Sequence, residues 1–149
     1  MSVSTVPAVL DAVLAAVRRA LPDVEVWDGQ PVKGTEDDVI MIGFTGDPEE
    51  AAVTSTITRE QMARDPDREA YNITCLASSW QGQQEDAKAV RDRAYELVDG
   101  VAGALATDQT LAELVMRAML STAAFAQAQT DRGAVATVQF VIHVDAYSR

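Results

Sequence analysis

The last part of the chain carries a strict alternation of apolar and other side chains. Every second residue from 136 to 146 is apolar, and most of the residues between them are polar. This alternation is typical of a β-strand with one face in a hydrophobic core and the other near water. The preceding sequence Asp131-Arg132-Gly133 predicts a turn in which Gly133 adopts a positive φ. The residues predicted to be buried are Ala136, Val138, Phe140, Ile142, Val144 and Ala146.

A strand of this length needs a partner of similar length, so we expect residues 114–147 to form one long antiparallel hairpin. In the first arm, Leu114 and the even-numbered apolar residues up to Ala128 share one parity, while Arg117, Ser121, Gln127 and Gln129 share the other. The start of this arm also fits a helical stripe of leucine, valine and alanine. We favour the strand because the second arm would otherwise have no partner.

Four further elements are expected along the chain. Helical spacing of apolar residues predicts a helix over Pro7–Leu21, with Ser4 or Thr5 as its N-cap. A short strand over residues 24–27 ends at the turn Asp28-Gly29. The continuous apolar run Val39–Phe44 predicts a central strand covered on both faces. Residues 71–78 alternate as a half-buried strand.

A second helix is expected to open at Gly82, with Glu85 and Asp86 in its first turn. It either ends near Gly100 or packs closely there, because glycine costs about 1 kcal/mol in a helix interior. The order of elements predicts a single α+β domain over residues 1–149, with a mostly antiparallel sheet, two helices packed on one face and the long C-terminal hairpin.

Residues 46–68 show no clear pattern of burial. The β-branched run at 53–58 lies between two segments rich in acidic residues and proline. It could be a strand that projects from the body or a mobile loop. We favour a partly extended excursion that becomes ordered against a neighbouring molecule, because an isolated polar β-ribbon is only marginally stable. Val53 and Ile57 are expected to have no place in the monomer core.

The net charge of −11 argues against a protein that binds duplex DNA, because such a protein needs a basic face for the phosphates. Cys75 is the single cysteine, so no intrachain disulfide can form. The first residues lack the pattern of a signal peptide, and no apolar run approaches the roughly 20 residues of a membrane span. We therefore expect neither secretion nor a membrane partner.

No motif predicts an active site or a cofactor. His143, the single histidine, is expected to be an exposed or interfacial strand residue, and Cys75 a small buried hydrophobe rather than a nucleophile. A Cys75–His143 pair remains an alternative from the sequence alone. The acidic groups at 36–38 and 47–50 could hold a divalent ion, but neither has the spacing of a calcium loop, and solvated charge is the simpler interpretation.

Several short motifs nevertheless stand out by their order and spacing. They are Val-Trp-Asp-Gly-Gln-Pro-Val at 26–32, the run at 39–44, Cys-Leu-Ala-Ser-Ser-Trp-Gln-Gly at 75–82, Arg-Asp-Arg-Ala-Tyr-Glu-Leu-Val-Asp at 91–99 and Gln-Ala-Gln-Thr-Asp-Arg-Gly-Ala at 127–134. Together they resemble the tail terminator (tail completion) proteins of long-tailed bacteriophages, particularly those of actinobacterial hosts. The resemblance spans about residues 7–147, although residues 46–68 match no pattern of that family.

The resemblance implies a small structural virion protein without catalytic residues. Such proteins form a hexameric ring at the head-proximal end of the tail tube, stop its polymerisation and present the surface that joins the neck. The implied partners are further copies of the chain, the major tail tube protein and a neck or head-closure protein. DNA would pass through the lumen without specific binding, and assembly would take place in the host cytoplasm. Another neck or tube component, or a small enzyme using Cys75, remains an alternative.

A closed ring needs two different surfaces on each subunit. We expect one on the polar parity of the hairpin and the other on the 46–68 excursion, and we expect acidic loops to line the lumen because they repel the phosphates of DNA. The predicted interface residues are Val53, Ile57, Gln127, Gln129, Thr137 and Gln139. The predicted lumen residues are Glu36, Asp37, Asp38, Asp47, Glu49 and Glu50.

Overall fold

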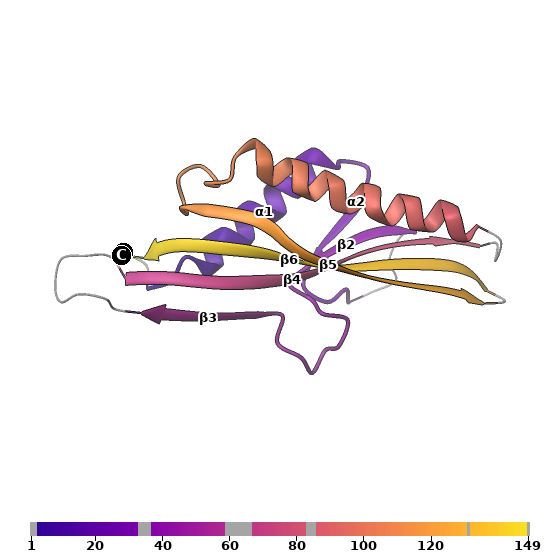
Figure 1. Ribbon diagram of the computed structural model, residues 1–149, viewed down its shortest axis with the longest axis horizontal. Coiled ribbons are helices and arrows are strands. Elements are labelled where there is room, and N and C mark those ends of the chain that lie inside the picture. Colours follow the sequence, from indigo (N-terminus) through magenta and orange to yellow (C-terminus); the bar gives the residue numbers. More distant parts are fainter. Residues whose placement is uncertain (1–2, 33–36, 59–66, 83–85, 131, 149) are drawn as a thin grey trace.

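The computed structural model describes residues 3–32, 37–58, 67–82, 86–130 and 132–148. These residues form one mixed β-sheet and two helices (Figure 1). The elements, in chain order, are α1 (Val6–Ala20), β1 (Glu25–Asp28), β2 (Asp38–Ile42), β3 (Val53–Thr58), β4 (Asp67–Gln81), α2 (Ala87–Thr107), β5 (Arg117–Thr130) and β6 (Gly133–Ser148). Within the described part of the chain, neither helix is long and apolar enough to cross a membrane.

The sheet is built around the long central strands β4 and β6. Its strand order is β1-β2-β4-β6-β5, and every pairing is antiparallel except that of β1 with β2. The strand β3 lies on the same side of β4 as β2 and pairs with residues 68–73, whereas β2 pairs with residues 75–79. The sheet therefore has β5 along one edge, and β1 and β3 at different heights along the other.

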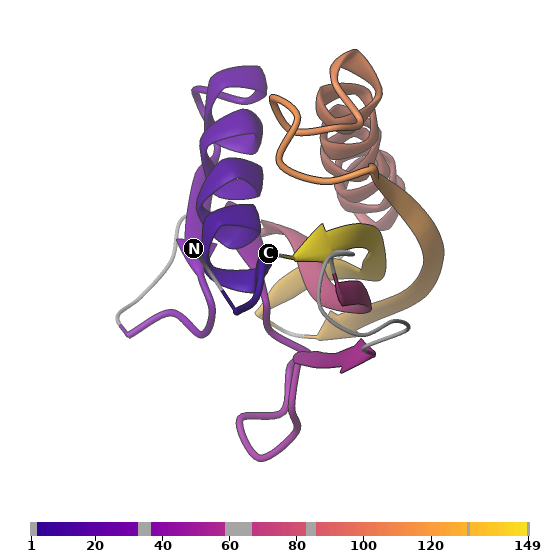
Figure 2. The ribbon, with the colours of Figure 1, turned by 90° about the vertical axis from the view of Figure 1, so that its left-hand side faces the viewer.

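Both helices cover the same face of the sheet (Figure 2). The even-numbered residues of β6 from Ala134 to Ala146 point into this layer and are buried, as the alternation in the sequence predicts. Odd-numbered residues of β4 pair with them and complete the sheet side of the core. The buried stripes of α1 and α2 close it from above. The predicted α+β class, with two helices on one face and a long C-terminal hairpin, is confirmed.

The hairpin is correct, but its first arm does not keep one parity. Leu120 pairs with Ile142 and Thr122 pairs with Val141, so Ser121 forms a β-bulge with no partner on β6. An extra residue on one strand shifts the later residues by one position relative to their own sequence parity. Even-numbered residues before the bulge face the helices, whereas odd-numbered residues such as Phe125 and Gln127 face them after it. The single-parity prediction for this arm is therefore wrong beyond Ser121.

Part of the predicted excursion belongs to the sheet of the monomer. The residues of β3 pair with β4 from Val53↔Ile73 to Thr58↔Arg68. Val53 is half-buried and packs against the core, so the expectation that it has no monomer core to enter is wrong. Ile57 is 36% exposed. The rest of the predicted excursion from 59 to 66 lies outside the described residues.

The second helix begins later and runs further than expected. It starts at Ala87, with Asp86 at the N-cap position, so the prediction that helix α2 opens at Gly82 with acids in its first turn is wrong. The helix continues through Gly100, where an added Cβ would lie 2.8 Å from Cδ2 of Leu21. Glycine is thus accepted in the helix interior because α2 approaches the end of α1 closely here, as one of the two sequence interpretations predicted.

Candidate assembly surfaces

The face of the sheet opposite α1 and α2, here called the helix-free face, has two chemically different halves. Near the hairpin turn, the rows across β4, β6 and β5 contain no charged side chain. Toward the other end, His143 and Asp145 lie on this face, and Arg117 is opposite Asp145. The uncharged rows are Leu76–Gln139–Ala124, Ser78–Thr137–Ala126 and Trp80–Val135–Ala128. This half of the face suits contact with another protein surface better than contact with a charged ligand.

A shallow hollow of about 290 Å³ lies in the uncharged half. The segment after β2 forms one of its walls, and the amide of Gln139 donates a hydrogen bond of 3.2 Å to the carbonyl oxygen of Thr45. Gly46 has a φ of +98° and lies beside Leu76, where an added Cβ would be in ordinary van der Waals contact with Cδ1 at 3.5 Å. The hollow also contacts Ala124, Ala126 and Thr137. Its lining is mostly apolar, with the hydroxyls of Thr45 and Thr137 and the amide of Gln139 as its polar side-chain groups, and no lining residue is charged.

The structure places the predicted interface residues in three separate regions. Thr137 and Gln139 lie on the helix-free face. The bulge turns Gln127 and Gln129 to the opposite side, where the side-chain amide of Gln127 donates 2.7 Å to the carbonyl oxygen of Ala87 at the start of α2. Val53 and Ile57 belong to β3, on the other side of β4. The four glutamine and threonine residues of the hairpin therefore do not form one surface.

The acidic residues predicted for a lumen are also divided. The carboxylate of Asp38 is 2.8 Å from Nε of Arg93 and accepts a hydrogen bond of 2.7 Å from Ser79, so this carboxylate joins β2 to α2 and β4. Asp47 accepts a 2.9 Å bond from the backbone N–H of Glu49 in an exposed turn, and Asp37, Glu49 and Glu50 are exposed. Glu36 lies outside the described residues. No group of three metal-ligand side chains occurs in the described part.

The two residues considered for catalysis, Cys75 and His143, lie in different environments. Cys75 is completely buried, and burial raises the pKa of its thiol to about 12. His143 is on the helix-free face, where Nδ1 is 2.7 Å from the side-chain oxygen of Asn72 and Nε2 is 3.4 Å from Asp145. Cys75 is buried, as predicted, and His143 is a half-buried residue of the last strand with its side chain on the helix-free face. A thiol with so high a pKa holds almost no thiolate near neutral pH.

A buried carboxylate that the sequence did not single out holds the start of α1. Glu69 of β4 has no solvent exposure and accepts hydrogen bonds from Ser4 Oγ (2.6 Å), Thr5 N (2.8 Å), Thr5 Oγ1 (2.6 Å) and Ser55 Oγ (2.7 Å). Thr5 occupies the N-cap position, as predicted, but makes no side-chain capping bond within its own helix. Glu69 provides the anion at the helix N-terminus instead, where the helix dipole favours negative charge.

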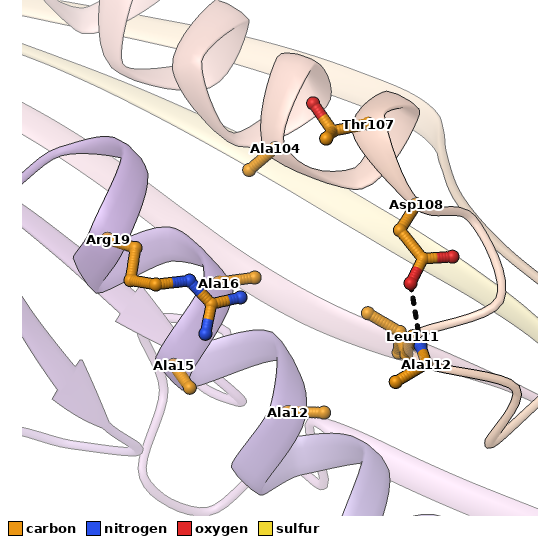
Figure 3. Close-up of a pocket in the computed structure, with 9 residues that line it drawn as sticks. All are labelled: Ala12, Ala15, Ala16, Arg19, Ala104, Thr107, Asp108, Leu111 and Ala112. Atoms are coloured by element: carbon orange, nitrogen blue, oxygen red, sulfur yellow. Dashed lines mark hydrogen bonds between the residues drawn. The ribbon is translucent and has the colours of Figure 1, made fainter.

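A second cavity, of about 240 Å³, lies between α1 and the chain that follows α2 (Figure 3). Alanines of both helices line it, with Arg19 and Asp108 among the lining residues. Residues 111–113 all have positive φ between 50° and 66°, a conformation that costs residues with a Cβ about 1–2 kcal/mol each. The carboxylate of Asp108 offsets part of this cost by accepting bonds from the backbone N–H groups of Thr110 (3.0 Å) and Ala112 (2.7 Å).

Comparison of the chain with protein-family models finds no match, and comparison with curated protein sequences also finds none. Among solved structures, 27 chains have a similar fold. One belongs to a structure described as the virion of a native gene transfer agent (GTA) particle, with a TM-score of 0.57 and 7% sequence identity. The alignment covers 99% of this chain and 100% of that chain. At this identity the likeness shows a common fold over the full length of both chains.

Proposed function

We propose that the protein is a structural component of a phage-like virion and acts as a tail terminator. The full-length similarity in fold to a chain of the gene transfer agent virion carries this proposal. The similarity covers 99% of this chain and all of the other, so it concerns the whole fold rather than a common supersecondary motif. The proposal therefore assigns the entire domain to assembly rather than to chemistry.

The sequence resemblance to tail terminators gives the more specific role. Its motifs fall on structurally defined places: residues 26–32 include most of β1 and the turn after it, residues 75–82 form the second half of β4, and residues 127–134 surround the hairpin turn. In the proposed role, copies of the chain form a ring on the head-proximal end of the tail tube, and the resemblance implies six copies. The ring ends tube polymerisation and joins the neck.

The partners follow from that position. Each subunit contacts further copies of itself, the major tail tube protein on one side and a neck or head-closure protein on the other. DNA passes through the lumen without specific binding, which suits a chain with 23 acidic and 12 basic residues. The exposed Asp47, Glu49 and Glu50 remain our candidates for the lumen wall, together with Asp37. Asp38 is the weaker candidate because it is engaged with Arg93.

Another neck or tube component is the alternative that the same fold similarity supports. The two roles differ in position: a terminator occupies one ring at the head-proximal end of the tail, whereas a tube protein repeats along its length. An enzyme using Cys75 is a poorer alternative, because its thiol is buried and its pKa is raised to about 12.

The decisive experiment is deletion of the gene in the phage or prophage that carries it, followed by electron microscopy of the lysate. We expect filled heads together with separate tails that are overlong or unjoined, and restoration of joined particles when the gene is supplied in trans. Joined particles of normal tail length in the deletion would refute the proposal. Immunogold labelling along the whole tail would instead favour a tube protein, and the Cys75→Ser variant, which should complement fully, is the control for chemistry.

A further inference from the structure

The sheet has three outer edges, and one of them is protected against pairing with another strand. Native proteins protect exposed edges with charged side chains, proline or covering segments. The short strand β1 begins with Glu25 and ends with Asp28. In addition, the guanidinium of Arg18 donates a hydrogen bond of 3.1 Å to the outward carbonyl oxygen of Val26. This edge is closed by acidic side chains and by a helix residue.

The edge formed by β5 has no such protection beyond its bulge. Before the bulge, the backbone N–H of Ala118 donates 2.7 Å to the carbonyl oxygen of Gln109, so the chain itself covers this part. Residues 122–128 contain neither charge nor proline, and Thr122 to Ala126 are all exposed. No described segment pairs with their outer side. A bare, uncharged edge of this length is a template for another strand.

The edge formed by β3 has the same character on the opposite side of the sheet. All six residues of Val53–Thr58 are uncharged, and in the described structure this strand pairs with β4 alone. Charged residues make up 23% of the chain, so these six and the seven residues 122–128 would together be expected to contain about three. Both bare edges contain none, although the protein as a whole is strongly charged.

The backbone groups that these edges present are compatible in direction and in face. Backbone groups of a strand alternate between its two edges. The backbone N–H of Ala118 points away from β6 before the bulge. The pairing with β6 therefore directs the backbone N–H and C=O groups of Ala123, Phe125 and Gln127 away from the sheet after the bulge. On β4, the backbone groups of Thr74 form hydrogen bonds on the side where β3 lies. The backbone groups of Thr54 and Thr56 therefore point toward β4, and those of the odd-numbered residues of β3 point away from the sheet. On both edges the outward residues carry side chains on the helix-covered face.

The geometry points to a direct contact between copies: residues 122–128 of β5 in one copy pair antiparallel with β3 in the next copy. This inference rests on the proposed ring and names the contact that closes it. Successive antiparallel pairings through β6 and β4 leave β5 and β3 running in opposite directions. A neighbour in the same orientation therefore meets β5 with an antiparallel β3, and the helices of both copies remain on one side of the joined sheet.

Pairing of β5 with β5 of a second copy is the competing arrangement. It would be isologous and would end at a dimer. It would also leave β3 uncharged and uncovered, so it accounts for one of the two bare edges. Pairing of β5 with β3 uses both edges, and because these edges lie on opposite sides of the sheet, it repeats from copy to copy until a ring closes.

Cysteine cross-linking distinguishes these arrangements. Ala124 and Thr56 are both exposed and lie on the helix-free face, where opposite residues of paired strands have Cβ atoms about 4.5–5.5 Å apart. The double variant Ala124→Cys/Thr56→Cys is treated with a short bismaleimide, with Cys75 left in place because it is buried. We expect a ladder of covalent oligomers that ends at the ring. Each single variant should stay monomeric on the denaturing gel, and so should Ala124→Cys/Asp28→Cys, which probes the protected β1 edge.

Proline substitution provides an independent reading. Proline is accepted at an edge where the N–H points away from the sheet. Ala123→Pro removes an outward N–H, so it should leave the thermal midpoint of the monomer within a few degrees of the wild type and abolish the ring in sedimentation velocity. Ala124→Pro removes an N–H that points toward β6, so it should lower the midpoint by at least 10 °C.

The outcomes of these experiments distinguish failure of the β5–β3 contact from failure of the proposed terminator function. Dimers from Ala124→Cys alone would replace the inference with β5–β5 pairing. Wild-type rings that form while the double variant does not cross-link, or rings that persist in Ala123→Pro, would overturn the contact and leave the terminator proposal standing. A wild-type chain that neither self-associates at millimolar concentration nor forms a ring in assembled particles would overturn both.

Discussion

Replacement of Glu69 by glutamine tests whether the buried carboxylate stabilises the domain. One oxygen of Glu69 accepts from the backbone and hydroxyl of Thr5, and the other accepts from Ser4 and Ser55. Glutamine keeps one acceptor oxygen and turns an NH₂ group toward the other two donors. Two hydrogen bonds to a charged group are lost, each worth about 1.5–3 kcal/mol, and rotation of the hydroxyls recovers part of this. We expect the free energy of unfolding to fall by about 2–4 kcal/mol.

The same substitution should change the pH dependence of stability. Burial raises the pKa of Glu69, but the hydrogen bonds from Ser4, Thr5 and Ser55 outweigh burial and lower its pKa below the ordinary value of 4.5. A carboxylate whose pKa is lower in the folded state binds its proton more readily in the unfolded state. Its contribution is therefore complete above pH 4.5 and is lost as the pH falls through the folded-state pKa. The Glu69→Gln variant has no carboxylate here, so its free energy of unfolding should fall less than that of the wild type as the pH is lowered.

Urea unfolding at pH 7 and at pH 3–4 measures both effects, and the exposed Glu96 provides the matched control. Glu96 pairs with Arg93 on the surface, so Glu96→Gln should change stability by less than about 0.5 kcal/mol. The wild type should be more stable than Glu69→Gln at pH 7, and this difference in the free energy of unfolding should shrink in acid. The difference between the wild type and Glu96→Gln should stay small at both pH values. A Glu69→Gln variant as stable as Glu96→Gln at pH 7 would show that the buried hydrogen bonds do not hold the helix start.

Four other substitutions, one of them a control, give direct outcomes. Phe140→Ala should lower the free energy of unfolding by about 3–5 kcal/mol in urea titration because the ring is fully buried, whereas Phe125→Ala, at 39% exposure, should cost only about 1 kcal/mol. Gly133→Ala should fail to accumulate as soluble protein, because a Cβ there would lie 2.1 Å from the carbonyl oxygen of Gln81 and φ is +133°; normal solubility and melting would contradict this. Thr56→Asp, at an exposed position of β3 on the helix-free face, should leave the free energy of unfolding of the monomer within about 1 kcal/mol but prevent ring formation in sedimentation, and an intact ring would count against β3 as a contact.

The sequence predicted the elements whose side chains repeat over many residues. The alternation around Phe140 defines the sheet side of the core, and the structure buries this side chain completely. The sequence did not predict the bulge at Ser121, because a bulge adds only one residue to the strand and small side chains follow it. Ser121 is followed by Thr122, Ala123 and Ala124, which show no clear alternation of hydrophobicity that would mark the shift of face.

The cluster around Glu69 escaped for a different reason. Its members lie in the chain before α1, in β3 and in β4, and 64 residues separate Thr5 from the carboxylate that binds it. Glu69 lies between Arg68 and Ala70, and from the sequence a glutamate in such a strand is expected to be solvated. Nothing local distinguishes it, because its environment depends on the pairing of β3 with β4 and on the position of α1.

The bulge at Ser121 also bears on the size of the assembly. Since no residue of β6 opposes Ser121, its removal would leave the partners of Leu120 and Thr122 unchanged and every later side chain on its present face. What the extra residue changes is the local bend and twist of the edge strand. If neighbouring copies join through the segment beyond it, that bend sets the angle between one subunit and the next. The number of subunits that completes a circle would then depend on curvature at one small polar residue rather than on the chemistry of the contact.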